Sequence, residues 1–381
     1  MRSRDIVIFT AIFVFLTGFT AKVVSLQLTG SSFPYLTANH AGLSLHRQRC
    51  TNTPIPVRPS TNDPQLKALA EYEQACRSAF ASDLMLFTDM PVTTTEALQA
   101  ADTMSARLKE FSAWHVTPIV VVEPDSSIGL LSFHTYASGA YDTWNADYFS
   151  RLKADGVTGS EMGIWIPFPE PQQPTWRGNS NPDDFAKSVN RYFGIEKQYF
   201  PQAKTAILLD SQVNRESLSQ VLAYTRLIKN SLVDIAGLQG FPWYPSDVGD
   251  PRAPITSASV FAPASMLEQI ARSIGTKTVL INTGTFRQKI LSDGSELAVP
   301  NAQREATITS IMKQVQMLQK DHYSVTVNIF AQNKLADSEA TNWSYWQQGD
   351  YDLSPATAIF TNFVNRLHSD HVAISIFDSR K

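Results

Sequence analysis

Acidic, amide and aromatic side chains stand at or near the ends of a series of short apolar segments. The polar members are His40, Asp89, Glu123, Glu170, Asp210, Gln239 and Asn282, and the aromatic members are Trp176, Trp243, Tyr244, Trp343 and Trp346. Aromatic rings stack on the apolar faces of sugar rings, while acids and amides hydrogen-bond to hydroxyl groups. The pattern therefore favours a site for a neutral ligand that is rich in hydroxyl groups.

Glu170 differs from the other acids because prolines flank it on both sides, at Pro169 and Pro171. Proline cannot continue a strand ladder and restricts the residue before it, so the chain leaves the strand here in a fixed shape. A charge held in this way beside Phe168 and Trp176 indicates a functional role. The other acids have a simpler alternative, since a single acid after a strand often caps the next helix. For Trp343 and Trp346, the alternative to ligand binding is a place in the core beneath a loop.

These side chains share a site only if the segments are strands of one sheet. Seven apolar runs predict strands, at Asp83–Thr88, Thr117–Glu123, Gly163–Phe168, Thr205–Leu209, Val233–Leu238, Thr278–Asn282 and Ser324–Phe330. The runs are continuous rather than alternating, as is typical of parallel strands that are buried on both faces. An eighth strand with weaker apolar content is expected at Leu36–Leu45, where it would come first in the chain.

Amphipathic stretches between these runs predict helices at Pro64–Phe80, Thr94–Trp114, Asp183–Phe200, Arg215–Asn230, Ala264–Ile274, Ala302–Asp321 and Pro355–His368. Eight such strand and helix units predict a single-domain (β/α)8 TIM barrel over residues 31–381. A doubly wound open sheet is the alternative, but no Gly-x-Gly-x-x-Gly fingerprint follows any strand. In a TIM barrel the carboxyl ends of the strands form one face, so we expect Asp89, Glu123, Glu170, Asp210, Trp243 and Asn282 at the same end.

The first 30 residues read as a targeting segment. Residues 6–21 are uncharged and apolar, Arg2 and Arg4 precede them, and Lys22 follows. We expect an apolar helix outside the globular domain, either a cleaved signal or an uncleaved membrane anchor, and favour the anchor because Phe19 fits a small-residue cleavage site poorly. This predicts an extracellular or cell-envelope protein. In an oxidising compartment Cys50 and Cys76 can form a disulfide bond, although two unpaired thiols remain the alternative.

Composition narrows the classes of partner. The 381 residues hold 32 Lys and Arg against 35 Asp and Glu, which gives a formal charge of −3 and a pI near 6.2. This balance gives no support to nucleic-acid binding. Two cysteines cannot build a metal site alone, and no His-x-x-x-His or Cys-x-x-Cys spacing occurs, so no metal is implied, and no organic cofactor is implied either. Contact with a membrane is expected through the N-terminal segment only, and no later segment is long and apolar enough to span one.

The segment Gly163-Ile-Trp-Ile-Pro-Phe-Pro-Glu170-Pro, followed by Trp176, resembles strand four of the clan A glycoside hydrolases. It is most similar to the mannanase-type glycoside hydrolase family 26. The resemblance implies a TIM barrel that hydrolyses glycosidic bonds of a polysaccharide or oligosaccharide, with Glu170 as the general acid/base. The aromatic residues at the strand ends would hold sugar rings.

The sequence departs from that clan's pattern in two places. The run at Thr278–Asn282, the seventh expected strand, ends without the acid that serves as nucleophile, and Pro169 stands where His or Asn is usual. Another acid, Glu339 or Asp210, can take the second role, or the enzyme can invert with more widely spaced carboxylates. The alternatives to an enzyme are a barrel that binds carbohydrate at the cell surface without cleaving it, and a membrane-tethered interaction protein whose aromatic residues are core.

Overall fold

The computed structural model describes residues 83–90, 93–113, 117–124, 133–172, 181–210, 218–240, 263–283, 288–290, 296–298, 301–329, 341–342, 366–367 and 369–378. The expected N-terminal helix at 6–21, the expected strand at 36–45 and both cysteines lie outside these residues. Within them, no helix combines the length and the apolar character needed to cross a membrane.

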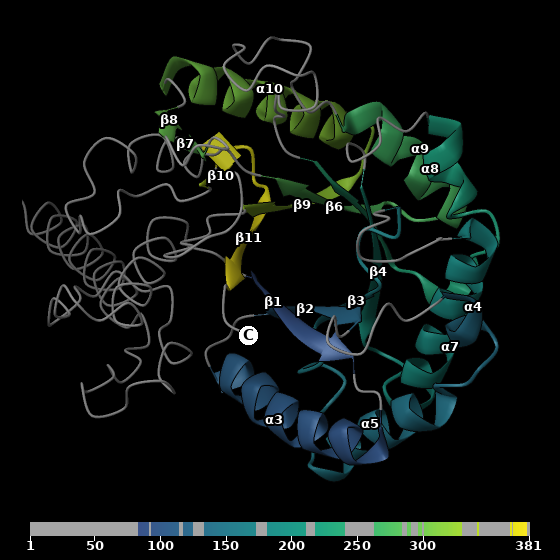
Figure 1. Cartoon of the computed structure of the whole chain (residues 1–381). Helices are drawn as coiled ribbons and strands as arrows, with labels where there is room; N and C mark the ends of the chain where they lie inside the picture. Colours follow the sequence, from purple (N-terminus) through teal and green to yellow (C-terminus); the bar gives the residue numbers. More distant parts are fainter. Residues whose placement is uncertain are drawn as a thin grey trace, which may run out of the picture.

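Eight parallel strands close into a barrel, as the apolar runs predicted (Figure 1). The strands are β1 (Asp83–Met90), β2 (Thr117–Pro124), β3 (Ile164–Pro167), β4 (Lys204–Asp210), β5 (Ile235–Gln239), β6 (Thr278–Thr283), β9 (Ser324–Ile329) and β11 (Ala373–Asp378). Their order around the barrel is β1-β11-β9-β6-β5-β4-β3-β2. Seven of the eight match the runs expected from the sequence to within two residues at each end.

The eighth strand corrects the sequence-based count. β11 pairs in parallel with both β1 and β9 and closes the barrel, a place that the sequence had assigned to residues 36–45. β1 is therefore the first strand of the barrel, and every later strand moves down by one. The segment that ends in Glu170 follows the third strand, and the fourth strand ends at Asp210.

Helices surround the barrel on its outer side (Figure 1). They are α3 (Thr94–Ala113), α4 (Phe133–Ala137), α5 (Asp142–Ala154), α7 (Pro182–Tyr199), α8 (Leu218–Ala223), α9 (Ala264–Ile274) and α10 (Asn301–Lys320). Two of these helices begin at a residue whose side chain caps the backbone. The Asn181 side chain accepts a 2.9 Å hydrogen bond from the Asp183 amide, with Pro182 next in the chain, and Thr93 Oγ1 accepts one of 3.2 Å from the Glu96 amide.

One helix is much shorter than expected. The stretch Arg215–Asn230 predicted a single helix, but α8 ends at Ala223 and a 3-10 helix, η4 (Asn230–Leu232), follows a turn. The backbone amides of Tyr224, Thr225 and Ile228 each donate to the carbonyl three residues earlier. These tighter bonds replace the pattern of an α-helix and end it early.

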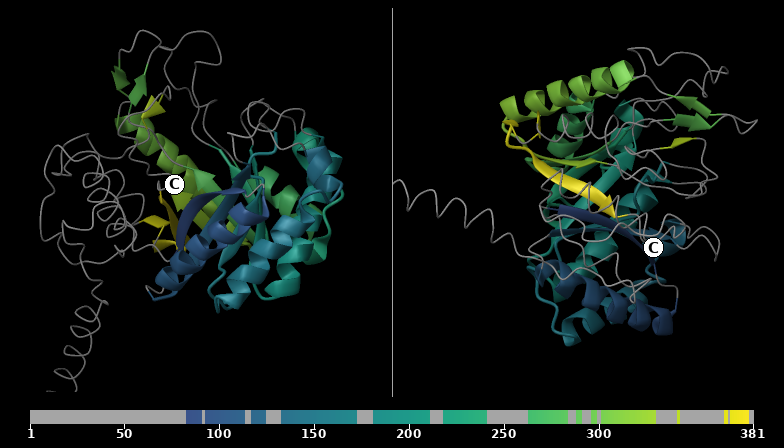
Figure 2. Two further views of the ribbon diagram at one scale, coloured as in Figure 1. Left: turned by 60° about the horizontal axis from the view of Figure 1, so that its bottom comes forward. Right: turned by 90° about the vertical axis from the view of Figure 1, so that its left-hand side faces the viewer.

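A small antiparallel sheet extends the connection between β6 and α10 (Figure 2). β7 (Gln288–Ile290) and β8 (Glu296–Ala298) form a hairpin, and β10 (Thr341–Asn342), which follows β9, pairs with β7. None of these strands was expected. Each has only two or three residues, too few for an apolar period to appear in the sequence.

The barrel strands bury both faces, as their continuous apolar runs predicted. A compact interior cluster comprises Met85, Ile119, Val121, Ile166, Ala206, Leu208, Ile235 and Leu280. The alternate residues of the same strands, such as Trp165 and Val120, belong to the larger core beneath the helices. Side chains of a strand alternate between its two faces, so each strand has a defined set that points into the barrel.

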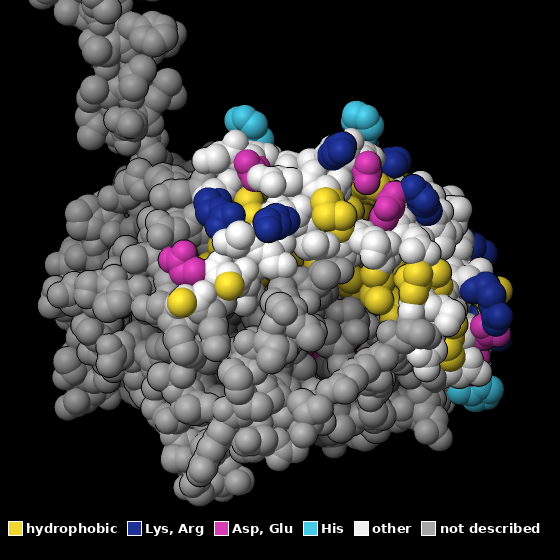
Figure 3. All heavy atoms as spheres, turned by 90° about the horizontal axis from the view of Figure 1, so that it is seen from above, with side chains coloured by type: hydrophobic (Ala, Val, Ile, Leu, Met, Phe, Trp, Pro, Cys, Tyr) yellow, Lys and Arg dark blue, Asp and Glu magenta, His cyan; other side chains and the backbone are white. Residues whose placement is uncertain are grey.

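Salt bridges join neighbouring helices on the outer surface. Arg151 of α5 pairs with Asp102 of α3, and Arg191 of α7 pairs with Asp142 of α5, both at 2.6 Å. On the face shown in Figure 3, Lys and Arg side chains are interspersed with Asp and Glu side chains. Such exposed pairs stabilise a fold by about 1 kcal/mol or less each.

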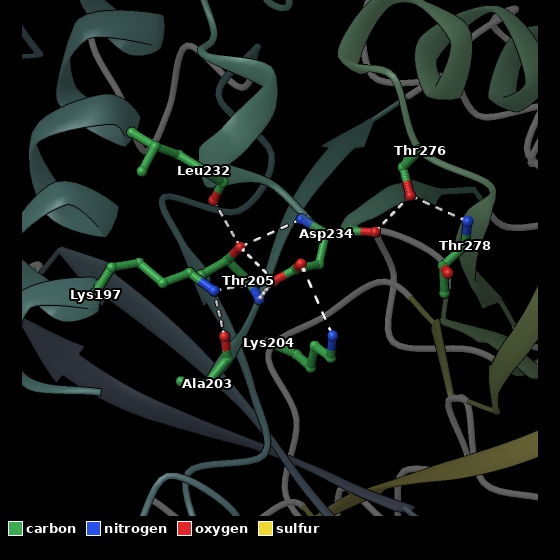
Figure 4. A network of polar contacts seen from close by, with 8 residues as sticks. All are labelled: Lys197, Ala203, Lys204, Thr205, Leu232, Asp234, Thr276 and Thr278. Carbon is green, nitrogen blue, oxygen red and sulfur yellow. Dashed lines mark hydrogen bonds and ion pairs between the residues drawn. The ribbon is translucent and has the colours of Figure 1, made fainter. Parts of the chain in front are cut away.

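The amino ends of the central strands are joined by a network around Asp234 (Figure 4). Its Oδ2 accepts hydrogen bonds from the Thr205 amide at 3.0 Å and from Lys197 Nζ at 3.1 Å. Its backbone carbonyl accepts one of 2.5 Å from Thr276 Oγ1. Burial raises the pKa of Asp234, but the Thr205 and Lys197 contacts outweigh that effect and hold the pKa below its usual value. The network binds β4, β5 and the start of β6 at the end of the barrel remote from the strands' carboxyl ends.

Candidate active site

A layer of polar side chains crosses the interior of the barrel at the carboxyl ends of its strands. The two-residue period that places Ile119 and Val121, Leu208, Ile235 and Leu280 inside the barrel continues to Glu123, Asp210, Gln239, Asn282 and, in β9, Asn328. All five are buried. Four of them are direct neighbours in the strand register, Asp210 opposite Gln239, Gln239 opposite Asn282, and Asn282 opposite Asn328. Buried polar groups on four adjacent strands form one continuous layer.

Glu170 joins this layer through an elbow that follows β3. Both Phe168 and Glu170 adopt left-handed backbone conformations, with φ of 54° and 52°. The Phe168 amide donates to the Val122 carbonyl at 3.1 Å, and the Glu170 amide donates to the Leu208 carbonyl at 2.9 Å. A left-handed non-glycine residue costs about 1–3 kcal/mol, and such residues cluster at functional sites. The elbow is held in this strained form between β2 and β4.

The Phe168 ring anchors the elbow in the outer core. It is buried and contacts the rings of Tyr136 at 4.6 Å, Phe133 at 5.5 Å and Tyr192 at 6.0 Å between centroids. The edge-on geometry of all three pairs is a favoured one for aromatic rings. The ring therefore fixes the backbone on the side opposite to the Glu170 carboxylate.

Gln172 fastens the same segment to the end of β4. Its Nε2 donates to the Asp210 carbonyl at 3.0 Å, and its Oε1 accepts from the Asp210 amide at 3.1 Å. This pair of bonds acts like one more rung of a strand ladder. It leaves the Asp210 side chain buried in the polar layer.

A chain of hydrogen bonds runs through the layer to Glu170. Asn328 Nδ2 donates to Asn282 Oδ1 at 2.6 Å, and Asn282 Nδ2 donates to Gln239 Oε1 at 2.5 Å. Gln239 Nε2 in turn donates to Glu170 Oε1. Four residues from the ends of β3, β5, β6 and β9 are thus connected through three amides.

The structure brings together several of the side chains that the sequence singled out. Glu123, Glu170, Asp210 and Asn282 lie at one end of the barrel, as expected, and Gln239 lies there with them. Asp89 lies opposite Glu123 in the register of β1 and β2. Trp165 is core, as its place within a strand indicated. The other candidates lie outside the described residues: His40, Trp176, Trp243, Tyr244, Glu339, Trp343 and Trp346.

Sequence reasoning missed Asn328 and Gln172. Asn328 lies within the expected strand and not at its end, and the alternation of that strand places its side chain inside the barrel. No local signal marks Gln172, because its partner is 38 residues away in the chain.

The acids of the described residues do not gather as metal ligands do: in this part of the chain no three His, Cys, Asp or Glu side chains are close enough to hold an ion. The site is instead a layer in which Glu170 accepts a hydrogen bond from Gln239, and Gln239 lies opposite Asp210 in the strand register. Glu123 adds a third carboxylate in the same layer. Such an array can transfer protons and hydrogen-bond hydroxyl groups.

Comparison with protein-family models and with curated proteins gave no match. Solved structures do match. The chain superposes on the "Family 1 b-glucosidase from Thermotoga maritima" with a TM-score of 0.50 and 11% identity, over 77% of this chain and 85% of that one. The same β-glucosidase in complex with castanospermine gives 0.50 and 10%, over 78% and 86%. At this identity the likeness concerns the fold: the chain shares the TIM-barrel architecture of these enzymes.

Proposed function

We propose that this protein is an exported glycoside hydrolase that acts on a polysaccharide or oligosaccharide, with Glu170 as the general acid/base. One observation carries the proposal. Glu170 is held in a strained, proline-bounded elbow at the carboxyl end of a closed barrel, and it enters a buried layer of acids and amides. Active sites of TIM barrels lie at this end.

The chemistry needs a second carboxylate, and we assign that role to Asp210. Gln239 hydrogen-bonds to Glu170 and is the register neighbour of Asp210, so the three residues meet at the carboxyl ends of the adjacent strands β3, β4 and β5. Neighbouring strands lie about 4.8 Å apart, which keeps both groups within the reach of a single glycosidic bond. Glu170 would protonate the leaving oxygen, while Asp210 would attack the anomeric carbon or activate a water molecule. Glu339 stays the other candidate for this role.

Membership of the clan A glycoside hydrolases, and closer kinship with family 26, is part of this proposal. The TIM-barrel fold that the chain shares with β-glucosidases supports membership of the clan, while the kinship with family 26 rests on the residues of the Gly163–Glu170 segment alone. The corrected strand count changes its details. The motif follows the third strand and not the fourth, while Asp210 ends the fourth and Glu339 lies in the segment after β9, the seventh. By strand number alone, Asp210 and Glu339 hold the positions at which the clan carries its two acids, so the role of Glu170 rests on its elbow and its hydrogen bond to Gln239 and not on its strand.

The remaining features complete the proposal. Trp176, Trp243, Tyr244, Trp343 and Trp346 would stack on sugar rings, and His40, Asp89, Glu123 and Asn282 would bind hydroxyl groups. Residues 1–30 would direct the protein to the cell envelope or the exterior and anchor it there. No metal, organic cofactor or nucleic acid enters the proposal.

A barrel that binds carbohydrate without cleaving it is the second candidate. Its support is that amides, Gln239, Asn282 and Asn328, occupy three consecutive places in the polar layer. Amides bind hydroxyl groups as both donors and acceptors but provide no acid or base.

The test is to incubate the full-length protein with a panel of polysaccharides and nitrophenyl glycosides and to measure the release of reducing ends or nitrophenol. Hydrolysis that is lost in the Glu170→Gln variant supports the enzyme. Retention of the protein on an immobilised polysaccharide without any release, in both wild type and variant, supports the binding protein. Neither binding nor release of any carbohydrate refutes both candidates.

A further inference from the structure

The hydrogen bonds that connect Asn328, Asn282 and Gln239 to Glu170 all run in one direction. The chemistry of the Glu170 carboxylate determines this direction. An ionised carboxylate only accepts hydrogen bonds, whereas an amide both donates and accepts. Gln239 must therefore turn its NH2 group toward Glu170, which leaves its oxygen toward Asn282. Asn282 then donates to that oxygen, and its own oxygen accepts from Asn328. Every amide donates toward the carboxylate.

This direction requires an amide oxygen without a partner at the end of the series farthest from Glu170. Asn328 is fully buried, and its Oδ1 has no hydrogen-bond partner among the described residues. Each of the three amides donates one hydrogen bond toward Glu170, so the oxygen of the amide farthest from Glu170 has no other amide of the series from which to accept one. Burial also strengthens each bond, because the low dielectric of an interior polarises linked hydrogen bonds in the same sense.

We propose that Asn328, Asn282 and Gln239 form a directional relay that positions Glu170 by holding its Oε1 as an acceptor, so that any proton on the carboxyl resides on Oε2. A proton on Oε1 would require Gln239 to rotate by half a turn, and Asn282 and Asn328 would have to rotate with it. The three amides oppose that exchange together. The effect of the relay on catalysis rests on the function proposed above, whereas the relay itself does not depend on that function.

The relay gives Asn328 a role at a distance. It lies on β9, two strands away from β5, and reaches Glu170 through two intermediates. It is a positioning residue, because its effect on the carboxyl group passes through Asn282 and Gln239. If the layer were only a set of independent polar pairs, a change at Glu170 would be felt by Gln239 alone.

The test is a pH titration of the full-length, 15N-labelled wild-type protein, in which the side-chain NH2 resonances of the relay are followed by NMR. Asn→Asp and Gln→Glu variants, which remove one NH2 pair each, provide the assignments. We expect the resonances of Gln239, Asn282 and Asn328 to shift with a common midpoint, by amounts that decrease along the chain. Asn190, whose Nδ2 donates to the Leu227 carbonyl at 2.8 Å on the outer surface, is the control amide and should not follow that midpoint.

The Glu170→Gln variant separates the relay from other titrating groups. Glu123 and Asp210 are the other carboxylates of the layer for which the structure describes the side chain, and Asp89 lies opposite Glu123 in register. Loss of the common midpoint in the variant identifies Glu170 as its source. A stationary Asn328 resonance in the wild type, or a midpoint that persists in Glu170→Gln, overturns the relay. The readout needs no hydrolysis, so an inactive protein would refute the proposed function and leave the relay standing.

Discussion

Replacing Glu196 with glutamine should stabilise the protein at neutral and higher pH and leave its stability nearly unchanged at pH 4. Glu196 lies on the buried side of α7 and has no solvent exposure. Neither carboxyl oxygen has a hydrogen-bond partner among the described residues. Burial raises its pKa well above the ordinary value, with a lowering contribution from Lys197 and a raising one from Asp234. The folded protein therefore retains this proton over a range in which the unfolded chain has lost it.

The magnitude follows from that difference in protonation. Below the unfolded pKa of about 4.3, glutamic acid is neutral in both states and the two proteins should be equally stable. As the pH rises from there toward the raised pKa, the free energy of unfolding of the wild type falls by about 1.4 kcal/mol per pH unit. Glutamine does not titrate. The advantage of the variant should grow at that rate and become constant at the pKa of the buried carboxyl.

Urea unfolding followed by tryptophan fluorescence, at each pH unit from 4 to 8, measures the difference directly. Other groups, such as Asp234, titrate in both proteins and cancel in the comparison. Glu268→Gln is the control, because Glu268 forms a surface pair with Arg272 on α9 and should change stability by about 0.5 kcal/mol or less at every pH. Parallel stability curves for wild type and Glu196→Gln would refute the reasoning.

Three further outcomes are expected. Gly156 and Gly163 both have positive φ, of 82° and 64°, but only at Gly163 would a Cβ meet a backbone atom, the Pro118 oxygen at 2.2 Å. Gly156→Ala should cost about 1 kcal/mol of unfolding free energy and Gly163→Ala about 1–3 kcal/mol more, and equal losses by urea unfolding would contradict this. Asp234→Asn should destabilise the protein by about 1–3 kcal/mol at pH 7. Because the pKa of Asp234 is lowered in the folded protein, this loss of stability should shrink as the pH falls through that pKa. A loss that is independent of pH would exclude the ion-pair network as its cause. Glu170→Gln should lower the hydrolysis rate about 10²–10⁴-fold with little change in melting temperature, whereas an unfolded variant would make Glu170 a structural anchor.

The barrel was predictable because its strands are buried on both faces. Runs such as residues 118–122 and 206–209 are apolar throughout, which few other elements of this length are. β11 was missed because its six residues, AISIFD, follow the last expected helix near the end of the sequence, and a full set of eight had already been reached with residues 36–45. Counting residues 36–45 as a strand in place of β11 moved every strand number by one and placed the Glu170 motif after the fourth strand instead of the third.

The residues of the site were easier to predict from the sequence than the contacts between them. Strand ends indicated Glu123, Asp210, Gln239 and Asn282, because parallel strands bring their carboxyl ends to one face. The bond between Gln239 and Glu170 joins residues 69 positions apart, and it depends on the barrel's register and on the left-handed elbow. Neither leaves a signal in the local sequence. Asn328 is the exception, since the two-residue period of its own strand carried the information.

The elbow at Glu170 links the packing of the outer core to the geometry of the site. Two left-handed residues cost about 2–6 kcal/mol together. Burial of the Phe168 side chain contributes about 1.5–3 kcal/mol, and the amides of Phe168 and Glu170 add about 1 kcal/mol each through their hydrogen bonds to β2 and β4. The two sums are of similar size, so the strained form persists because aromatic packing outside the barrel and backbone bonds to its strands hold it. The carboxylate inside can then accept its hydrogen bond from Gln239 without also having to hold its own backbone in place.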